Sequence, residues 1–345
     1  MTKENKSVTR REFIIGSIGL VATGGIIGLA SKNILSGSSE NKNIVRNSYR
    51  EELEKLTKVD PSLINYQEIK KIDVNCHDLK AVTVDSQDRI YIASDKSIQV
   101  LNRDISFHNK LNLKDTPRCL TISENGDIYA GMRDHVEIYD LKGGFKSRWE
   151  NLGGNPVLTS LAVSDGNVFV ADAGNRKVLR FDSSGKLIRQ IDGGREAHSF
   201  TVPSPYFDLA VSPDGLLRVA NPGEHRIEAF TFDGDLELAW GNASLAIDSF
   251  CGCCNPVNFA ILPDGRFVTS EKGVPRIKVY KQNGRFESVV ATRENFAKNA
   301  ANCANNGLSD CKKGGMDVTV DSTGRIVVMD PIEKNIRIFE RINKA

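Results

Sequence analysis

The sequence lacks a surplus of charge of either sign: 46 lysines and arginines against 44 aspartates and glutamates leave a net charge of +2. Residues 1–30 hold four basic and two acidic residues, so the remainder of the chain is neutral. Proteins that bind nucleic acid draw much of their affinity from basic side chains placed against phosphates. We therefore expect no nucleic-acid partner.

Several catalytic signatures are also missing. The sequence contains no phosphate-binding loop, no Ser-His-Asp arrangement with a nucleophile elbow and no Cys-x-x-Cys-His haem attachment site. Nucleotide hydrolysis, serine hydrolysis on an α/β fold and covalent haem binding each require one of these elements. Their absence favours a non-enzymatic role.

Long hydrophobic runs are absent except at residues 13–30, which carry no charge and contain five glycines. A permanent membrane span usually needs about 20 strongly apolar residues, so this weakly apolar run is typical of a targeting segment. It is preceded by paired arginines, Arg10 and Arg11, within Ser7-Val8-Thr9-Arg10-Arg11-Glu12-Phe13-Ile14. This string resembles the twin-arginine (Tat) export signal.

The resemblance implies a route that carries folded proteins and a periplasmic or other extracytoplasmic location. We expect residues 1–30 to be a Tat signal peptide cut near Gly28-Leu29-Ala30, with retention as an uncleaved anchor as the alternative. No cysteine directly follows the apolar run, so a lipoprotein is not expected. Residues 31–62 are polar and predict a tether with a short helix around 49–58, which Asp60-Pro61-Ser62 ends.

From residue 63 onward one pattern recurs: a short apolar strand, a polar turn, and three further strands. A repeat of about 40 residues with four strands fits a propeller blade, because one four-stranded sheet must stack on neighbours to bury its faces. We therefore predict an all-β, six-bladed β-propeller over residues 63–345. The six first strands are Ala81-Val82-Thr83-Val84, Cys119-Leu120-Thr121-Ile122, Ser160-Leu161-Ala162-Val163, Asp208-Leu209-Ala210-Val211, Asn258-Phe259-Ala260-Ile261 and Asp317-Val318-Thr319-Val320.

The third repeat carries a family resemblance. Its string Val168-Phe169-Val170-Ala171-Asp172-Ala173-Gly174-Asn175-Arg176-Lys177-Val178 resembles an NHL repeat, and weaker copies extend over residues 79–342. The resemblance implies a propeller that most often serves as a protein-binding module. It implies no particular activity.

The two ends of the propeller region complement each other. The sixth repeat stops one strand short, after Asn335-Ile336-Arg337-Ile338-Phe339. The string Gln67-Glu68-Ile69-Lys70-Lys71-Ile72-Asp73 echoes Lys186-Leu187-Ile188-Arg189-Gln190-Ile191-Asp192, the fourth strand of the third repeat. We therefore predict that an N-terminal strand completes the last blade, which removes two sheet edges.

The seven cysteines are an odd number, so at least one must have a role outside an intrachain disulfide. They fall in, or just after, the lead-in segments, by which we mean the stretches that precede the innermost strand of each blade. In a propeller these segments share one face around the channel mouth. The cysteines are Cys76, Cys119, Cys251, Cys253, Cys254, Cys303 and Cys311.

The densest group lies in Cys251-Gly252-Cys253-Cys254, with Cys303 and Cys311 about fifty residues later. Thiolates from two loops suit an iron–sulfur cluster, zinc or cuprous copper. Adjacent Cys253 and Cys254 would point to opposite sides of an extended segment, so one of them is expected to join Cys251, Cys303 and Cys311. Cys76, His77, Cys119 and His198 are secondary ligand candidates on the same rim.

The cysteines have two alternative roles that the sequence leaves open. Two disulfides could pin the fifth and sixth lead-in segments to each other, with no cofactor. Free or redox-active thiols are the third possibility.

Three functions follow from these patterns. The first is a propeller with a cysteine-ligated metal or iron–sulfur centre that has a redox or accessory role toward a protein partner, such as a membrane or periplasmic redox complex. The second is a binding scaffold stiffened by disulfides. The third is a calcium-dependent, lactonase-like hydrolase, because six-bladed lactonases hold calcium with oxygen ligands at the channel, where Asp208, Asn258 and Asp317 start three consecutive inner strands.

Overall fold

A computed structural model describes residues 58–149, 152–193, 200–298 and 314–342. The chain divides into two compact units, Met1–Lys58 and Val59–Ala345, and the second is the propeller. The proposed signal, and the predicted helix around 49–58 up to residue 57, lie outside the described residues. Among the described residues, no helix is both long and apolar enough to cross a membrane.

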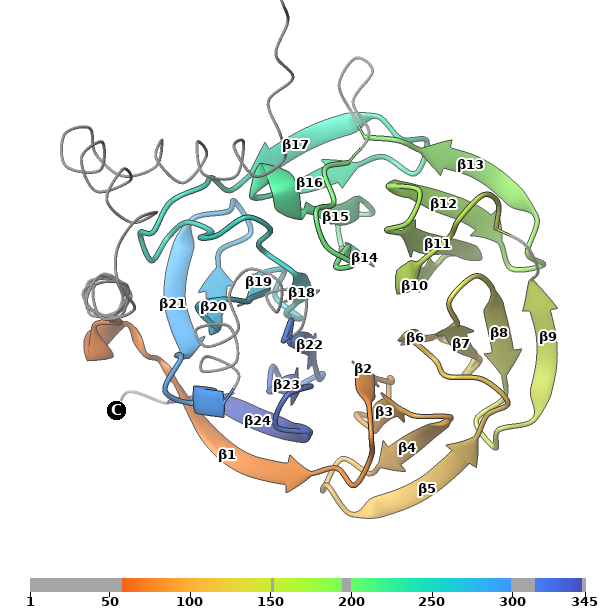
Figure 1. Ribbon diagram of the computed structural model, residues 1–345, viewed down its shortest axis with the longest axis horizontal. Helices are drawn as coiled ribbons and strands as arrows, with labels where there is room; N and C mark the ends of the chain where they lie inside the picture. Colours follow the sequence, from red (N-terminus) through yellow and green to blue (C-terminus); the bar gives the residue numbers. More distant parts are fainter. Residues whose placement is uncertain (1–57, 150–151, 194–199, 299–313, 343–345) are drawn as a thin grey trace, which may run out of the picture. The chain divides into compact units, whose positions relative to one another are not determined.

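Six four-stranded antiparallel sheets are arranged around a central opening, as Figure 1 shows. This confirms the predicted six-bladed, all-β propeller. Blades one to three contain β2 (Leu79–Val84), β3 (Ile90–Ser94), β4 (Ser97–Leu101) and β5 (Phe107–Asn112); β6 (Cys119–Ile122), β7 (Ile128–Gly131), β8 (Val136–Tyr139) and β9 (Phe145–Trp149); and β10 (Leu158–Ser164), β11 (Asn167–Asp172), β12 (Lys177–Asp182) and β13 (Leu187–Ile191).

Blades four to six have the same order from the channel outward, and two short 3-10 turns, η1 (Pro61–Leu63) and η2 (Pro222–Glu224), accompany them. Blade four contains β14 (Leu209–Val211), β15 (Leu217–Asn221), β16 (Arg226–Phe230) and β17 (Leu236–Trp240); blade five contains β18 (Asn258–Ile261), β19 (Phe267–Glu271), β20 (Arg276–Tyr280) and β21 (Phe286–Ala291); and blade six contains β22 (Asp317–Val320), β23 (Ile326–Asp330), β24 (Asn335–Arg341) and β1 (Tyr66–Asp73).

Strand β1 closes the ring as predicted. It pairs antiparallel with β24, from Tyr66 opposite Arg341 to Asp73 opposite Asn335, and so becomes the outer strand of blade six. In Figure 1 the orange β1 lies beside the blue β24. The last blade is therefore built from both ends of the propeller unit.

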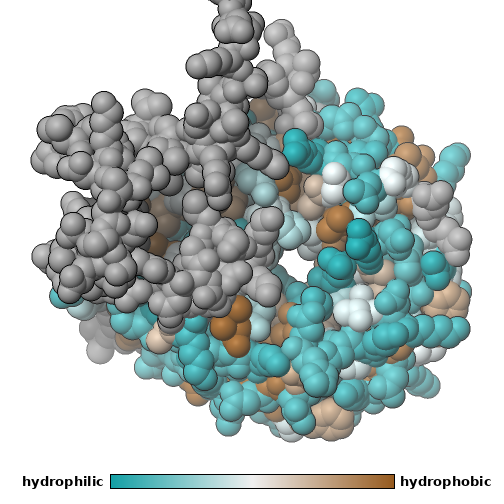
Figure 2. All heavy atoms as spheres, viewed as in Figure 1, coloured by the Kyte–Doolittle hydropathy of each residue, from teal (hydrophilic) through white to brown (hydrophobic). Residues whose placement is uncertain are grey.

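The hydrophobic core lies between adjacent blades. Phe169 and Val178 of blade three pack with Leu209, Val219 and Phe230 of blade four, for example. The second strands are almost entirely buried because they contact a blade on each side, whereas outer strands such as β13 are largely exposed. The innermost strands line the central channel, and its opening is visible in Figure 2.

Candidate functional site

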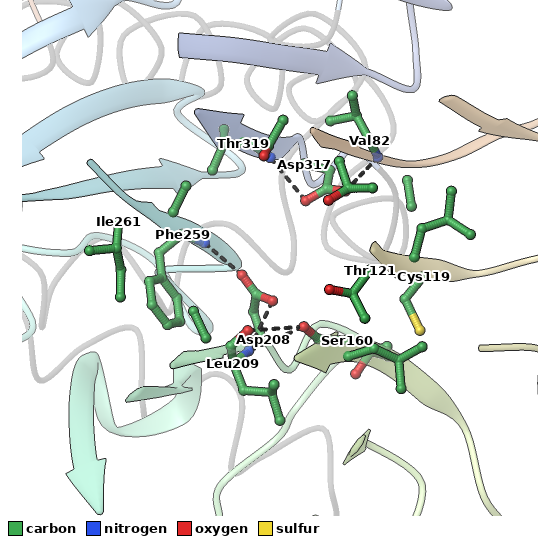
Figure 3. Close-up of a pocket in the computed structure, with 18 of the residues that line it drawn as sticks. Val82, Cys119, Thr121, Ser160, Asp208, Leu209, Phe259, Ile261, Asp317 and Thr319 are labelled. Carbon is green, nitrogen blue, oxygen red and sulfur yellow. Dashed lines mark hydrogen bonds between the residues drawn. The ribbon is translucent and has the colours of Figure 1, made fainter. Parts of the chain in front are cut away.

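The central channel contains a cavity of about 230 Å³, lined by inner-strand residues of all six blades (Figure 3). Asp208 directly precedes β14 and is buried. Its carboxylate accepts hydrogen bonds from the backbone N–H of Leu209, at 2.9 Å, and from that of Phe259 in blade five, at 2.8 Å. Burial raises the pKa of Asp208 to about 6, although these hydrogen bonds oppose the shift.

Asp317, at the start of β22, has the equivalent role two blades later. Its carboxylate accepts from its own strand at Val318 and from Val82 of blade one, both at 2.9 Å. Burial raises the pKa of Asp317 to about 7, with a further contribution from the charge of Asp208. These two carboxylates thus link blade four to blade five and blade six to blade one.

Asn258 joins blades as well, because its Nδ2 donates to the Met316 carbonyl at 2.8 Å. The three candidate calcium ligands therefore all take part in blade-to-blade hydrogen bonds. Within the four described stretches of chain, no three His, Cys, Asp or Glu side chains are placed to hold a metal ion together.

The described cysteines have separate surroundings, apart from one pair. Cys119 is buried in the core between blades two and three, where its sulfur packs over Gly131, and burial raises the pKa of its thiol. Cys76 is half-buried against the core between blades six and one. His77 is exposed, and its backbone N–H donates to Asp95. Cys303, Cys311 and His198 lie outside the described residues.

Cys251 contacts a buried charge cluster at the end of β19. Its sulfur lies 3.4 Å from Glu271 Oε2 and 3.3 Å from Arg276 Nη2. Glu271 also forms ion pairs with Arg276, at 2.8 Å, and with Lys278, at 2.5 Å, and all three side chains are at most 2% exposed. Burial and the nearby Glu271 carboxylate raise the pKa of Cys251 to about 12, so this thiol stays protonated.

Cys253 and Cys254 form a thiol pair. Their sulfurs are 3.3 Å apart, a hydrogen-bonding distance for thiols. Cys253 is exposed and Cys254 is buried. The hydrogen bond from Cys253, assisted by Lys272 and Ser204, lowers the pKa of Cys254 despite its burial.

This arrangement corrects one sequence-based expectation. An extended segment around Cys253 and Cys254, as expected from the sequence, would point the two side chains apart. The backbone instead bends over residues 252–254, and Gly252 has a φ of +85°, a conformation that favours glycine. The bend turns both sulfurs toward each other.

The segment is fixed at several points. The side chain of Asn255 donates to the carbonyls of Cys251 and Lys272, at 2.5 and 3.1 Å, and accepts from the Lys272 N–H at 2.9 Å. Lys278 Nζ donates to the Ser249 carbonyl at 2.7 Å, just before the segment. His225 Nε2 lies 2.6 Å from the Gly252 carbonyl oxygen.

The residues that hold this segment belong to no motif in the sequence. Two charged side chains, Arg276 and Lys278, alternate along β20, a strand that the repeat pattern places inside the blade. Charges on a buried strand call for a buried counter-charge, which is Glu271 at the end of the neighbouring strand. Lys272 follows Glu271 directly, whereas Ser204 is 68 residues away and no spacing indicates it.

Neither a protein family nor a curated protein matches this sequence. Solved structures match its shape. Streptogramin B lyase has a TM-score of 0.55 at 12% identity, over 82% of this chain and all of that one. A catalytically inactive virginiamycin B lyase from Staphylococcus aureus with quinupristin has a TM-score of 0.53 at 12% identity, over 80% of this chain and all of that one.

A chain of the mitotic checkpoint complex also matches, with a TM-score of 0.56 at 10% identity over 83% of this chain and 95% of that one. At such identities the likeness concerns the fold. The chain is a six-bladed β-propeller.

Proposed function

We propose that this chain is an exported accessory protein that binds a protein partner and serves it through a thiol site on blade five. One observation carries the proposal: the sulfurs of Cys253 and Cys254 are held 3.3 Å apart, one exposed and one buried. A protein complex that contains a similar propeller supports the partner-binding part. The Tat-like string around Arg10 and Arg11 supports export.

A metal or iron–sulfur centre is one form that this site could take. Cys253 and Cys254 fit it as thiolate ligands, because they are adjacent and Cys254 has a lowered pKa. Cys251 does not fit, because its pKa is raised and its sulfur is engaged by Glu271 and Arg276. Cys303 and Cys311 would have to complete the ligand set. A cluster or copper ion bound there would supply one-electron transfer to the partner.

The site is tested by anaerobic purification of the wild type, of a Cys253→Ser/Cys254→Ser variant and of Cys76→Ser as a matched control. We expect fast-reacting thiols or bound metal in the wild type and the control, and neither in the double variant. The readouts are thiol titration, an absorption spectrum and elemental analysis. Identical thiol reactivity and metal content in all three proteins would refute the proposal.

Export is tested separately. Replacing Arg10 and Arg11 by lysine keeps the charge but removes the paired guanidinium groups, so we expect the chain to stay in the cytoplasm of a host with a working Tat system. Cell fractionation followed by immunoblotting is the measurement. Unchanged export of the twin-lysine variant would rule out this route.

A hydrolase or lyase centred on the channel is the second candidate. It is favoured by two buried carboxylates of raised pKa, Asp208 and Asp317, which line the cavity, and by similar folds in two lyases. Calcium-dependent ester cleavage that is lost in Asp208→Asn and Asp317→Asn, but kept in Cys253→Ser/Cys254→Ser, would establish it. Loss of the same activity in the cysteine variant alone would place the reaction elsewhere.

A further inference from the structure

The two thiols of blade five differ in what can reach them. Cys253 is exposed, whereas Cys254 is 2% exposed. A molecule that approaches from solvent therefore meets the sulfur of Cys253 first. The sulfur of Cys254 lies 3.3 Å behind it, within the range of 3–3.5 Å that is typical of reacting atoms held ready for bond formation.

Polar groups surround the buried thiol. Lys272 is 4% exposed, donates to Ser204 Oγ at 2.9 Å and places its ammonium 4.7 Å from the ring centre of Tyr206. Lys272 and Ser204 also interact with the sulfur of Cys254. The buried sulfur of Cys254 thus has two polar neighbours, Lys272 and Ser204, that are themselves buried.

Hydrogen bonds fix the backbone on which the two thiols lie. Asn255 ties the segment to both backbone groups of Lys272, and Glu271 contacts the N–H and the sulfur of Cys251. Glu271 and Lys272 are consecutive residues at the end of β19. The segment that carries the thiol pair is thus tied by hydrogen bonds to the end of β19, directly beside Lys272.

From this geometry we infer that Cys253 and Cys254 exchange with a disulfide, Cys253 as the attacking thiol and Cys254 as the resolving thiol. The inference rests on the proposed function only in placing the reactive site on blade five. Lys272 acts as a positioning residue, since it touches the resolving sulfur and not the incoming substrate.

Two steps complete the reaction. The sulfur of Cys253 attacks a substrate R–S–S–R′, forms a Cys253–S–S–R mixed disulfide and releases R′–S⁻, which takes the proton of Cys253. The sulfur of Cys254 then attacks that of Cys253, closes the Cys253–Cys254 disulfide and releases R–S⁻. The substrate disulfide gains the two electrons that the cysteine pair loses, and the second released thiolate takes its proton from Cys254 or from water.

Oxidised glutathione serves as the probe, and mass spectrometry of the intact full-length protein as the readout. The wild type is expected to lose two hydrogens without keeping glutathione. Cys254→Ser is expected to keep one glutathionyl group on Cys253, because nothing resolves the mixed disulfide. Cys253→Ser is expected to react with glutathione far more slowly, because its remaining thiol is buried. Cys76→Ser should behave as the wild type.

Lys272→Met gives a readout that a purely structural role would not produce. We expect it to form the mixed disulfide at the wild-type rate and to resolve it about tenfold more slowly, because the sulfur of Cys254 loses a side chain that positions it. Equal slowing of both steps would mean that Lys272 only supports the fold.

A wild type that ends as a stable mixed disulfide, or a Cys254→Ser variant that traps none, would overturn the exchange reaction. Metal content and thiol titration of the same preparations keep the two proposals apart. If metal content or thiol reactivity still depends on Cys253 and Cys254, the proposed thiol site is supported and only disulfide exchange is refuted.

Discussion

Blades three and five use the same position for different purposes. Asp172 ends β11 and Glu271 ends β19, and each pairs with the first residue of the next strand. In blade three, Asp172 accepts the backbone N–H of Val157 from its own lead-in segment, at 3.0 Å, and two N–H groups of the following turn. In blade five, Glu271 accepts the N–H of Cys251 from its lead-in segment, at 3.4 Å.

The difference lies in what surrounds the two carboxylates. Two residues along the third strand, blade three has buried Leu179 and blade five has buried Lys278, which forms an ion pair with Glu271. The carboxylate at this position accepts backbone N–H groups in blade three. In blade five it is also the counter-charge of two buried cations, Arg276 and Lys278. The segment that leads into the same blade carries the thiol pair, so the charge cluster and the thiol pair are departures from the common blade that occur together.

The largest expected effect comes from neutralising Glu271. In Glu271→Gln, Arg276 and Lys278 lose their buried counter-charge, so we expect the free energy of unfolding to fall by about 3–5 kcal/mol. The matched change Asp172→Asn keeps an acceptor oxygen and should cost about 1 kcal/mol. Denaturant unfolding measures both. Equal losses of unfolding free energy in the two variants would mean that the two carboxylates contribute equally to stability.

The blade junctions offer a second test. Blade four fastens to blade five through the Asp208 carboxylate, whereas blade three fastens to blade four through the Thr159 hydroxyl, which donates to the Phe207 carbonyl at 2.6 Å. Asp208→Asn takes away one acceptor and leaves a buried N–H unpaired, so we expect a loss of about 1–3 kcal/mol in unfolding free energy. Thr159→Val should cost about 1 kcal/mol. A larger loss for Thr159→Val would contradict this order.

The channel carboxylates also predict a pH dependence. Their folded pKa values, about 6 for Asp208 and about 7 for Asp317, lie above the ordinary value of 3.8. Between these values the folded state binds more protons than the unfolded state, so stability falls as pH rises from about 4 to about 7. Each group contributes at most about 1.4 kcal/mol per pH unit. Denaturant unfolding at several pH values across this range measures it. The unfolding free energy should change less with pH in Asp208→Asn/Asp317→Asn than in the wild type.

The smallest effect is expected for Lys278→Leu, which gives blade five the residue of blade three. Glu271 keeps Arg276 as its partner and one buried cation is removed, while the Ser249 carbonyl loses its donor, so the unfolding free energy should fall by only about 1 kcal/mol. Added to Glu271→Gln, the same change should recover part of the lost stability. A double-mutant cycle measures this coupling, and an additive result would argue against a shared cluster.

The fold was predictable because its signals are local and repeated. Each blade shows the same strand and turn pattern, and the missing strand of the sixth repeat indicated that an N-terminal strand would pair with β24, as β1 does. A strand that buries one face alternates apolar and polar residues, and this alternation can be recognised in the sequence. Export and membership of the NHL family stay predictions.

The candidate site was predictable only in part. The motif at residues 251–254 indicated a thiol site, but the contact between Cys253 and Cys254 depends on a backbone bend that residue types alone did not reveal. The separation of Cys251 from that pair depends on Glu271 and Arg276, 20 and 25 residues away. Such contacts are set by the packing of blade five rather than by any spacing in the sequence.

Closure of the ring sets an order of events during synthesis. Strand β1 is made first and its partner β24 last, with every other blade between them. Until β24 has been translated, β1 has no strand to pair with. The finished disc can form only after translation has passed Arg341, so the propeller completes its fold after synthesis rather than during it.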